Sequence, residues 1–365
     1  MHPNMEPVRA KLLKLSEGTS CSHAYRKALV KLLQQHVPFD AACCTTVDPE
    51  TLLSTGAVTD KEVELIHDRL FEYDYVRTDY IPYHQLVKSD DSTATLSGAT
   101  EGRLTSSARY RNVLSPAGFS DELRAALIYK GVCWGYLTLF RRFGQPFFSE
   151  EERAFIASLV PIIALRLRRS SFAMPAEVKA EPDMEPGILV LDERLGTLSA
   201  NETAYRWLSR LREWEGIDGA TLPRPVRTAC FRALSTWSAA SLPAQSPAKS
   251  CVHLPGYPYL TIRASQLHGP ADGPRLAVSF EPAGPADTLR LMAEACELSE
   301  REKQILDALI RGMSTKELAL SLHISAYTVQ DHIKSIFVKT GVSSRRDLVW
   351  RLFSRFGVVS RLEDL

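Results

Sequence analysis

The sequence predicts a multi-domain protein: two α/β (α+β) domains followed by an all-α domain of four helices. Strand-like runs alternate with helical periodicity through residue 280, whereas only helical periodicity follows. Two proline-containing segments, Met174–Pro186 and Glu281–Pro285, interrupt these patterns and are typical of connectors. We therefore expect three domains, at residues 1–172, 187–282 and 286–365.

The composition is typical of a globular protein in water. The chain has 365 residues, of which 45% are hydrophobic and 24% charged, and its formal net charge is +1. No stretch approaches the ~20 apolar residues that span a bilayer, and the N-terminus, with Glu6 and Glu17, lacks the apolar core of a signal peptide. We therefore expect a cytoplasmic location and no membrane partner.

The sequence lacks the motifs of common enzymes and metal sites. It contains no P-loop, no GxGxxG after a strand, no HExxH and no GxSxG. The seven cysteines are not paired at CxxC spacing, so we expect buried free thiols. Cys43 and Cys44 fall on a predicted strand and should face opposite sides; a redox switch is the alternative. No enzyme activity, metal or cofactor is predicted.

The first domain is predicted to combine helices with two strand hairpins. The second hairpin turns at Lys130-Gly131, which suits a tight turn, and Ser149 with Glu152 matches the capping box of a final helix. The expected elements are a helix at 24–36, strands at 41–47 and 51–55, a helix at 61–73, a short helix at 106–114, strands at 122–130 and 132–141, and a helix from 149 to about 169.

The order of these elements resembles that of a GAF domain, and the segments GYLTLFRR and FSEEE carry the resemblance. In many regulators a GAF domain holds a small ligand over its central sheet, which implies a pocket between the sheet and residues 74–118. Five side chains of this region are the candidate ligand contacts: Tyr73, Tyr80, Tyr83, Arg109 and Tyr110. The alternative is that these side chains fill the core or lie on a loop.

The second domain begins with the strand, turn, strand and helix of GILVLDERLGTLSANETAYRWLSRL. Strand alternation predicts that four apolar side chains face the core of the sheet: Ile188, Val190, Leu195 and Leu198. A second helix is expected around Val226 and Cys230, and three strands are expected at 251–254, 259–267 and 276–280.

This opening resembles a PAS domain, including Asn201 directly before the helix. PAS domains can bind haem, flavin or small molecules, but no feature of this sequence selects one of them. A spacer or dimerisation role without a pocket is the alternative interpretation.

Capping chemistry marks the helices of the C-terminal domain. Ser299 with Glu302, and Ser314 with Glu317, match the capping box, in which each side chain bonds the other residue's backbone N–H. A further helix is expected at 326–339. Its apolar stripe consists of Val329, Ile333, Ile336 and Phe337.

The other side of this helix carries groups that can read bases. It presents Tyr327, Thr328, Gln330, Asp331 and Lys334. Gln pairs with adenine, Lys donates to guanine, and a carboxylate accepts from cytosine. Between residues 311 and 355 eight basic residues outnumber three acidic ones, a local charge of +5 that suits phosphate binding. A protein-binding helical bundle with the same spacing is the alternative.

The segment LSEREKQILDALIRGMSTKELALSLHISAYTVQDHIKSIFVKTGVSSRRDLV resembles the LuxR-type helix-turn-helix of bacterial transcription regulators. The resemblance implies that this helix enters the major groove and that the following helix supplies a dimer contact. Many members have a basic residue in place of Gln330, so we expect a different base preference here. The implied roles are base contacts from Gln330, Asp331 and Lys334, phosphate contacts from Thr328, His332 and Lys339, and a dimer seam of Leu348, Val349 and Leu352. Tyr327 and Lys316 are expected to contact DNA as well. For His332, a structural role beside the neighbouring helix is the alternative.

Together these features predict a one-component transcription regulator that binds double-stranded DNA as a homodimer, because a single helix-turn-helix buries little surface. The GAF-like and PAS-like domains are expected to sense a small-molecule effector. The alternative is a constitutive DNA-binding regulator whose residues 1–280 form a dimerisation and protein-interaction platform that docks another regulator or RNA polymerase. The first domain lacks an early acidic pair after an apolar strand, so control by an aspartyl phosphate is not expected.

Overall fold

The computed structural model of the chain describes residues 5–18, 21–77, 79–171, 185–235, 247–257, 259–268 and 273–348. The chain divides into two compact units: the first comprises Met1–Ser171, Glu185–Val252 and Ile262–Phe280, and the second comprises Phe172–Met184, His253–Thr261 and Glu281–Leu365. The first unit thus holds most of both α+β domains, and the second holds the helical domain. Most of the predicted connector Met174–Pro186 lies outside the described residues.

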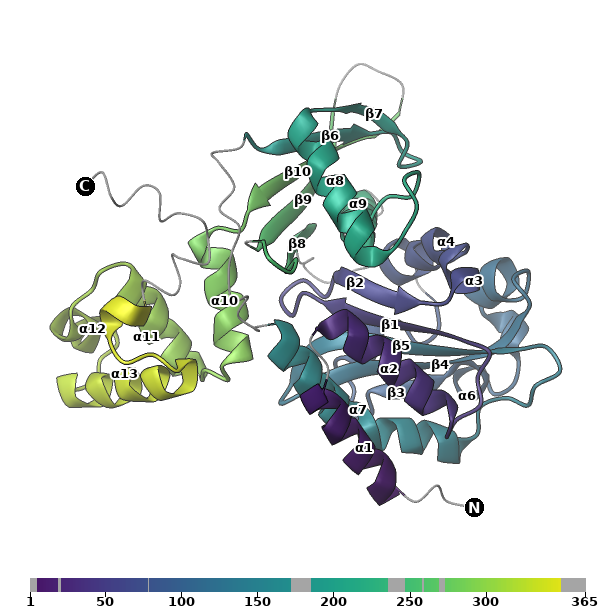
Figure 1. Ribbon diagram of the computed structural model, residues 1–365, viewed down its shortest axis with the longest axis horizontal. Coiled ribbons are helices and arrows are strands. Elements are labelled where there is room, and N and C mark those ends of the chain that lie inside the picture. Colours follow the sequence, from purple (N-terminus) through teal and green to yellow (C-terminus); the bar gives the residue numbers. More distant parts are fainter. Residues whose placement is uncertain are drawn as a thin grey trace. The chain divides into compact units, whose positions relative to one another are not determined.

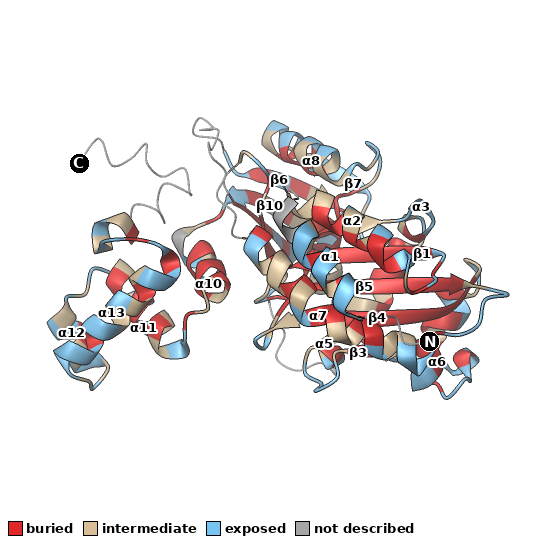
Figure 2. Ribbon diagram, turned by 60° about the horizontal axis from the view of Figure 1, so that its bottom comes forward, coloured by how far each residue is buried: buried red, intermediate tan, exposed pale blue. Residues whose placement is uncertain are grey.

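A five-stranded antiparallel sheet forms the centre of the first domain, with strand order β2-β1-β5-β4-β3 (Figure 1). Its strands are β1 (Ala41–Val47), β2 (Ser54–Thr59), β3 (Thr93–Thr95), β4 (Phe119–Tyr129) and β5 (Val132–Arg142). Figure 2 shows that β1, β4 and β5 are buried along most of their length. The predicted turn between β4 and β5 is confirmed, because Lys130 and Gly131 have φ values of 50° and 80°.

Helices cover both faces of this sheet. Helices α1, α2 and α7 pack against one another on one face, and α7 begins with the predicted capping box between Ser149 and Glu152. The helical elements are α1 (Met5–Gly18), α2 (Ser22–Gln34), α3 (Lys61–Glu64), α4 (His67–Phe71), η1 (Glu72–Val76), α5 (Tyr83–Leu86), α6 (Leu96–Ala99), η2 (Leu104–Ser106), η3 (Tyr110–Leu114) and α7 (Glu150–Ser171).

The second strand of the first hairpin begins three residues later than predicted. It occupies Ser54–Thr59 instead of 51–55, because residues 48–53 form a wide turn. Asp48 holds this turn: its Oδ1 accepts hydrogen bonds from the backbone N–H of Glu50 (2.9 Å) and Thr51 (3.3 Å). An Asp side chain that bonds the backbone in this way favours a turn over a strand.

The predicted helix at 61–73 is broken into three pieces, α3, α4 and η1. In η1 the backbone N–H of Arg77 donates to the carbonyl of Glu72 (2.8 Å), a five-residue spacing that defines a π-helical turn. The predicted helix at 106–114 likewise becomes the short 3₁₀ turn η2 and the π-helical η3. Apolar periodicity does not distinguish these turns from an α-helix, because over five residues the apolar positions of a 3₁₀, an α and a π turn nearly coincide.

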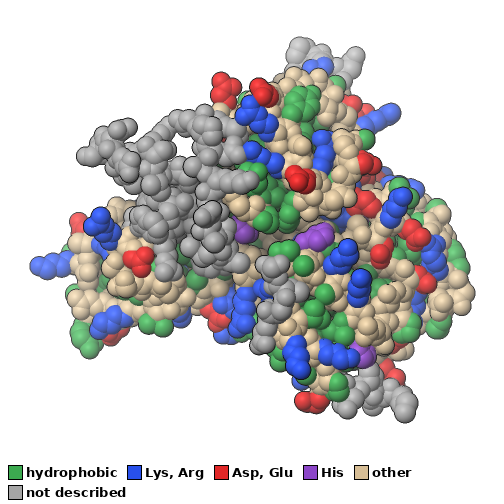
Figure 3. All heavy atoms as spheres, viewed as in Figure 1, with side chains coloured by type: hydrophobic (Ala, Val, Ile, Leu, Met, Phe, Trp, Pro, Cys, Tyr) green, Lys and Arg blue, Asp and Glu red, His purple; other side chains and the backbone are tan. Residues whose placement is uncertain are grey.

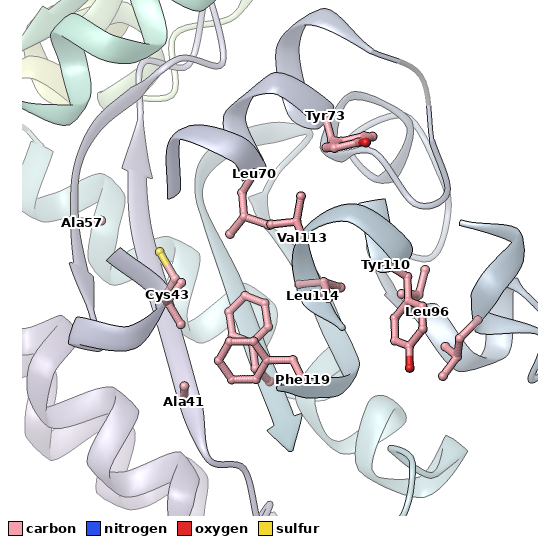
Figure 4. Packing of buried hydrophobic residues seen from close by; sticks show 13 residues of the cluster. Ala41, Cys43, Ala57, Leu70, Tyr73, Leu96, Tyr110, Val113, Leu114 and Phe119 are labelled. Carbon is pink, nitrogen blue, oxygen red and sulfur yellow. The ribbon is translucent and has the colours of Figure 1, made fainter. Parts of the chain in front are cut away.

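An apolar cluster fills the space between the sheet and the segments that follow β2 (Figure 4). Leu70 of α4 and Val113 of η3 point toward each other, and the Cys43 thiol of β1 lies on the same side of the sheet. All seven cysteines are free thiols, and five of them are buried, as predicted.

A second antiparallel sheet, of order β7-β6-β10-β9-β8, forms the centre of the second domain. Its strands are β6 (Gly187–Leu191), β7 (Thr197–Ala200), β8 (Lys249–Val252), β9 (Leu260–Leu267) and β10 (Arg275–Pro282), with α8 (Glu202–Glu215) and α9 (Arg224–Ser235) between β7 and β8. Asn201 caps α8: its Oδ1 accepts from the N–H groups of Ala204 (3.0 Å) and Ile188 (2.9 Å). One side chain thereby joins the helix start to β6.

The predicted inward face of this sheet is wrong by one residue. Leu189 and Leu191 are fully buried, whereas Ile188 and Leu198 are half exposed. Val190 is only partly buried, and Leu195 lies in the turn before β7 with a φ of 64°. The strand GILVL is apolar throughout, so its sequence contains no alternation from which the inward face can be deduced.

The C-terminal unit contains α10 (Pro285–Ala295), α11 (Glu300–Ile310), α12 (Thr315–Ser321) and α13 (Ala326–Thr340), and residues 345–348 are again helical. Both predicted capping boxes, at Ser299 and Ser314, are confirmed. Helix α10 was not predicted, and it begins at Pro285; in the predicted connector Glu281–Pro285, the first two residues end β10, and only Ala283 and Gly284 lie between the strand and the helix. In the part of the chain that the structure describes, no helix combines the length and apolar character needed to cross a membrane.

Candidate functional site

Helix α13 buries one face and exposes the other. Ser325 caps its start by accepting from the N–H of Thr328 (3.0 Å), and Gly341 ends it in the left-handed region at φ 68°. Val329 and Ile336 are fully buried in the domain core, and Ile333 and Phe337 pack against this core. The predicted apolar stripe is therefore confirmed.

The opposite face holds the side chains that were predicted to read bases. Tyr327 is 72% exposed, and the side chains of Asp331 and Lys334 are 53% and 73% exposed. Thr328 and Gln330 are also exposed. The Lys334 ammonium lies 3.8 Å from the Asp331 carboxylate, so the acidic residue has a cationic neighbour that reduces its repulsion of a phosphate.

The two remaining polar candidates on α12 and α13 differ in exposure. Lys316 of α12 is exposed, whereas His332 of α13 is half buried. Figure 3 shows acidic and basic side chains interspersed over one face of the molecule, in agreement with the net charge of +1. The structure thus brings Tyr327, Gln330, Asp331 and Lys334 together on one helix face and leaves His332 at its edge.

Lys339 has an intramolecular partner that the sequence did not indicate. Its ammonium donates to the Glu302 carboxylate (2.7 Å) and to the carbonyl of Glu297 (3.1 Å). Ser335 donates to the other oxygen of Glu302 (2.6 Å), so α13 is fastened to the first turn of α11. Burial alone would raise the pKa of Glu302, but hydrogen bonds from Lys339, Ser335 and Ser299 lower it to about 2.

Two arginines complete this attachment of helices. Arg301 donates to the carbonyl of Leu322 (2.6 Å) at the end of α12, and Arg345 donates to the carbonyl of Leu309 (2.7 Å) at the end of α11. Both acceptors are carbonyls at the C-terminal end of a helix, where side-chain donors commonly add hydrogen bonds. These two bonds join α11 to the end of α12 and to the last helical segment, whereas Glu302 joins α11 to α13.

The predicted dimer seam needs one correction. Leu348 is only 1% exposed and belongs to the core of its own domain, because the last helical segment folds back on α11. A side chain packed in this core is not available to a second subunit. Val349 and Leu352 lie outside the described residues.

A second candidate site is a polar cavity of about 30 Å³ in the first domain, between the sheet and the segments α4 and η1. Such a volume has room for about two water molecules. The lining residues are Cys43, Thr45, Ser54, His67, Leu70, Phe71, Asp74, Tyr75, Tyr83, Arg109, Arg124, Tyr136, Thr138 and Phe140. Two π-helical turns lie next to it, since η1 contains Asp74 and Tyr75 and η3 follows Arg109. Such turns are frequent at functional sites.

Buried ion pairs hold the cavity wall. Arg124 donates to Asp74 (2.8 Å), and Arg109 donates to Glu122, which lies behind the wall. The Tyr83 ring stacks on Tyr136 with centroids 3.8 Å apart, and the Arg124 guanidinium lies over Tyr83. Burial raises the pKa of Tyr83, so its hydroxyl stays protonated, and it lies 2.5 Å from the hydroxyl of Thr138.

The structure places two of the five predicted ligand residues, Tyr83 and Arg109, in this wall. Tyr73 and Tyr110 are buried in the apolar cluster instead, and Tyr80 is 38% exposed. Arg124 also lines the cavity and was not predicted, although an arginine inside the predicted strand at 122–130 is a signal of a buried partner. A charged residue on a buried strand requires a partner, and here Asp74 supplies it.

Helix α9 of the second domain contacts the outer side of the cavity wall. Arg224 Nη1 lies 3.1 Å from Nε2 of His67 and 3.4 Å from the thiol of Cys43, both lining residues. Arg224 and Arg227 both donate to Glu64. Burial and the guanidinium groups of Arg224, Arg227 and Arg109 hold the pKa of His67 well below its usual value. His67 is therefore neutral and accepts from Arg224.

The described residues contain no group of three His, Cys, Asp or Glu side chains arranged to hold a metal ion. The structure offers one exposed helix face with amide, carboxylate and ammonium groups, and one cavity lined by hydrogen-bonding groups.

A sequence profile described as "Bacterial regulatory proteins, luxR family" matches residues 297–352, the segment that contains α11, α12 and α13. Transcriptional regulatory protein UhpA of Salmonella typhimurium is 39% identical over 56 residues, which are 15% of this chain and 29% of UhpA. The chain therefore spans less than a third of that relative. Spore germination protein GerE of Bacillus subtilis is 38% identical over 55 residues, 15% of this chain and 74% of GerE.

Among solved structures, the GAF domain of a phosphoenolpyruvate-protein phosphotransferase from Coxiella burnetii aligns with 46% of this chain and 94% of its own. The identity is 16% and the TM-score 0.29, so this similarity carries no weight. The residues that match the luxR family profile include the helices whose capping boxes and exposed face are described above. The chain belongs to the luxR family of bacterial regulatory proteins.

Proposed function

We propose that this protein regulates transcription by reading duplex DNA with the exposed face of α13. The observation that carries the proposal is the division of this helix, in which Val329 and Ile336 are buried while Gln330, Asp331 and Lys334 face solvent. Amide, carboxylate and ammonium groups on one helix face match the donor and acceptor pattern of the major groove.

The test is the affinity of the full chain for duplexes selected from a random pool, measured by fluorescence anisotropy. Lys334→Ala should weaken the preferred duplex by about 1 to 3 kcal/mol, roughly 5- to 150-fold, and relax the preference at one position. Lys303→Ala on α11 is the control, because that ammonium is paired with Glu294 (2.6 Å) and Glu300 (2.7 Å). Equal losses for both variants, or no binding at low salt, would contradict the proposal.

We infer further that the regulator acts as a homodimer, since one helix-turn-helix covers little DNA surface. Sedimentation of the full chain with and without duplex measures this directly. A strictly monomeric complex with a single half-site would contradict it.

We also infer that a small molecule bound by the N-terminal half controls DNA binding. Two features support this control: the polar cavity, and the contact of its wall with α9 through Arg224. A ligand changes an equilibrium only by binding two states differently, and a contact between the cavity wall and α9 is a route by which the two domains could be coupled. The second domain is proposed to be PAS-like, because its α8 and α9 follow two strands and precede three, and because Asn201 caps α8.

The competing proposal is constitutive DNA binding with an N-terminal platform for a protein partner. The two differ in the response of the full chain to small molecules. Under ligand control, a fraction of the host metabolite pool should shift the duplex affinity of wild type by at least several fold, and a variant with an altered cavity should not respond. If no fraction changes the affinity while a host protein co-purifies with residues 1–280, the platform is favoured.

A further inference from the structure

The cavity in the first domain has hydrogen-bond donors that no protein group uses. Among the described residues, Nε of Arg109 and Oγ of Ser54 have no hydrogen-bond partner, although Arg109 is 3% and Ser54 1% exposed. Nε of Arg124 also lacks one and lies 3.4 Å from the Glu122 carboxylate. A buried polar atom without a partner calls for an explanation, and beside a cavity a bound polar molecule is one that accounts for it. All three atoms belong to residues that line the cavity, and we take them as a guide to the chemistry of what it accepts.

These groups require acceptor atoms from the ligand. An arginine Nε only donates, and a serine hydroxyl can donate as well. The unpartnered Oε2 of Glu122 is an acceptor, but Glu122 is not part of the lining. Oxygen atoms of a carbonyl or amide meet this requirement.

The charges around the cavity are already balanced. Arg109 and Arg124 are paired with Glu122 and Asp74, and His67 is neutral. Burial raises the pKa values of Tyr75, Tyr83 and Tyr136, so these hydroxyls are uncharged as well. An ionic ligand would add a buried charge without a counter-charge, which costs several kcal/mol.

We propose that this cavity binds the carbonyl or amide end of a small, uncharged molecule. The volume of about 30 Å³ limits the inserted group to a few heavy atoms. This ligand class is the one that would exert the control of DNA binding inferred above. Binding to the cavity does not depend on that control, but any effect of the ligand on DNA does. Because His67 and Cys43 contact Arg224, an occupant that moves the wall also moves α9.

Three isosteres of different charge test the ligand class: formamide, formate and formamidinium. Saturation-transfer NMR on the full chain should detect formamide, and its signal should fall at least threefold in Ser54→Ala. The two ions should give the same weak signal with both proteins. Ser54→Ala should fold, since it removes a hydroxyl without a partner, and its melting temperature should be unchanged or higher. Ser170→Ala is the control, because that buried hydroxyl donates to the carbonyl of Leu167 (2.8 Å) away from the cavity.

The outcomes separate this proposal from the proposed function. A formate signal that depends on Ser54 would make the site anionic and overturn the proposed class. If wild type and Ser54→Ala give equal signals with all three isosteres, and Arg109→Lys gives the same signals as well, the cavity is not a binding site. Formamide binding without any change in duplex affinity would keep the site and refute ligand control of DNA binding.

Discussion

On α13 the side chains of Lys334 and Asp331 are 73% and 53% exposed, whereas on α9 those of Arg224 and Arg227 are 2% and 3% exposed. The two helices therefore use charge differently. Exposed charges remain hydrated and contribute little to folding stability, so they are available to a binding partner. Buried charges stabilise the fold only as complete pairs. We expect substitutions on α9 to affect folding and substitutions on α13 to affect DNA binding.

The largest effect is expected for Arg224→Met. The substitution removes one of the two guanidinium groups that pair with Glu64 and the cation beside the buried Glu215, and breaking a buried pair costs about 3 to 5 kcal/mol of unfolding free energy. Urea denaturation of the full chain measures this loss. Arg206→Met is the control, because its partner Glu202 is 80% exposed, and it should leave stability nearly unchanged. Equal stability of the two variants would remove the distinction between the helices.

Glu302→Gln should remove a contribution to the stability of the C-terminal domain that is present at neutral pH and lost in acid. The carboxylate has a folded pKa of about 2 against an ordinary 4.5, so its contribution is complete above pH 4.5 and is lost as the pH falls toward 2. At neutral pH the variant should lose about 2 kcal/mol, since its bonds to Lys339 and Ser335 weaken. The difference in stability between wild type and variant, measured from pH 7 to pH 2, should shrink; a constant difference would contradict this role.

Glu215 should show the opposite pH dependence. Burial raises its pKa to about 7 against the opposing effect of Arg224, and its Oε1 is enclosed without a hydrogen-bond partner among the described residues. The folded state therefore binds more protons than the unfolded state between pH 4.5 and 7, and stability falls as the pH rises through this range. Glu215→Gln should remove this slope and gain about 1 to 2 kcal/mol at pH 8. An unchanged slope would show that Glu215 is ionised throughout.

The smallest effect is expected for Val338→Lys. Val338 is 82% exposed and lies one turn after Lys334 and two turns after Asp331, on the same face of α13. An added cation there should strengthen binding to all duplexes a few fold and steepen the salt dependence by about one counterion. Leu65→Lys in the first domain, at an 80% exposed position, is the control. A gain limited to one sequence would mean that position 338 contacts a base.

The first domain shows how far sequence reasoning extends. The strand at 41–47 and the hairpin at Lys130-Gly131 were predicted, because local turn chemistry and β-branched or apolar runs fix them. The shift of β2 and the breaks in the helix at 61–73 were not, because side-chain bonds such as those of Asp48 select among turns of similar sequence. The inward face of β6 could not be predicted either, since an entirely apolar strand has no polar side to mark.

What the sequence by itself determined is the division of α13 into a buried and an exposed face, together with the two capping boxes before it. These features depend on spacings of three to eight residues within one helix, which the chain contains regardless of its tertiary fold. The tertiary structure decided which charges meet: Lys339 with Glu302 across 37 residues, Arg124 with Asp74 across 50, and Arg224 with Glu64 across 160. Such pairs form only where the path of the whole chain brings distant segments together, and so the cavity and its partner helix could not be deduced from local pattern.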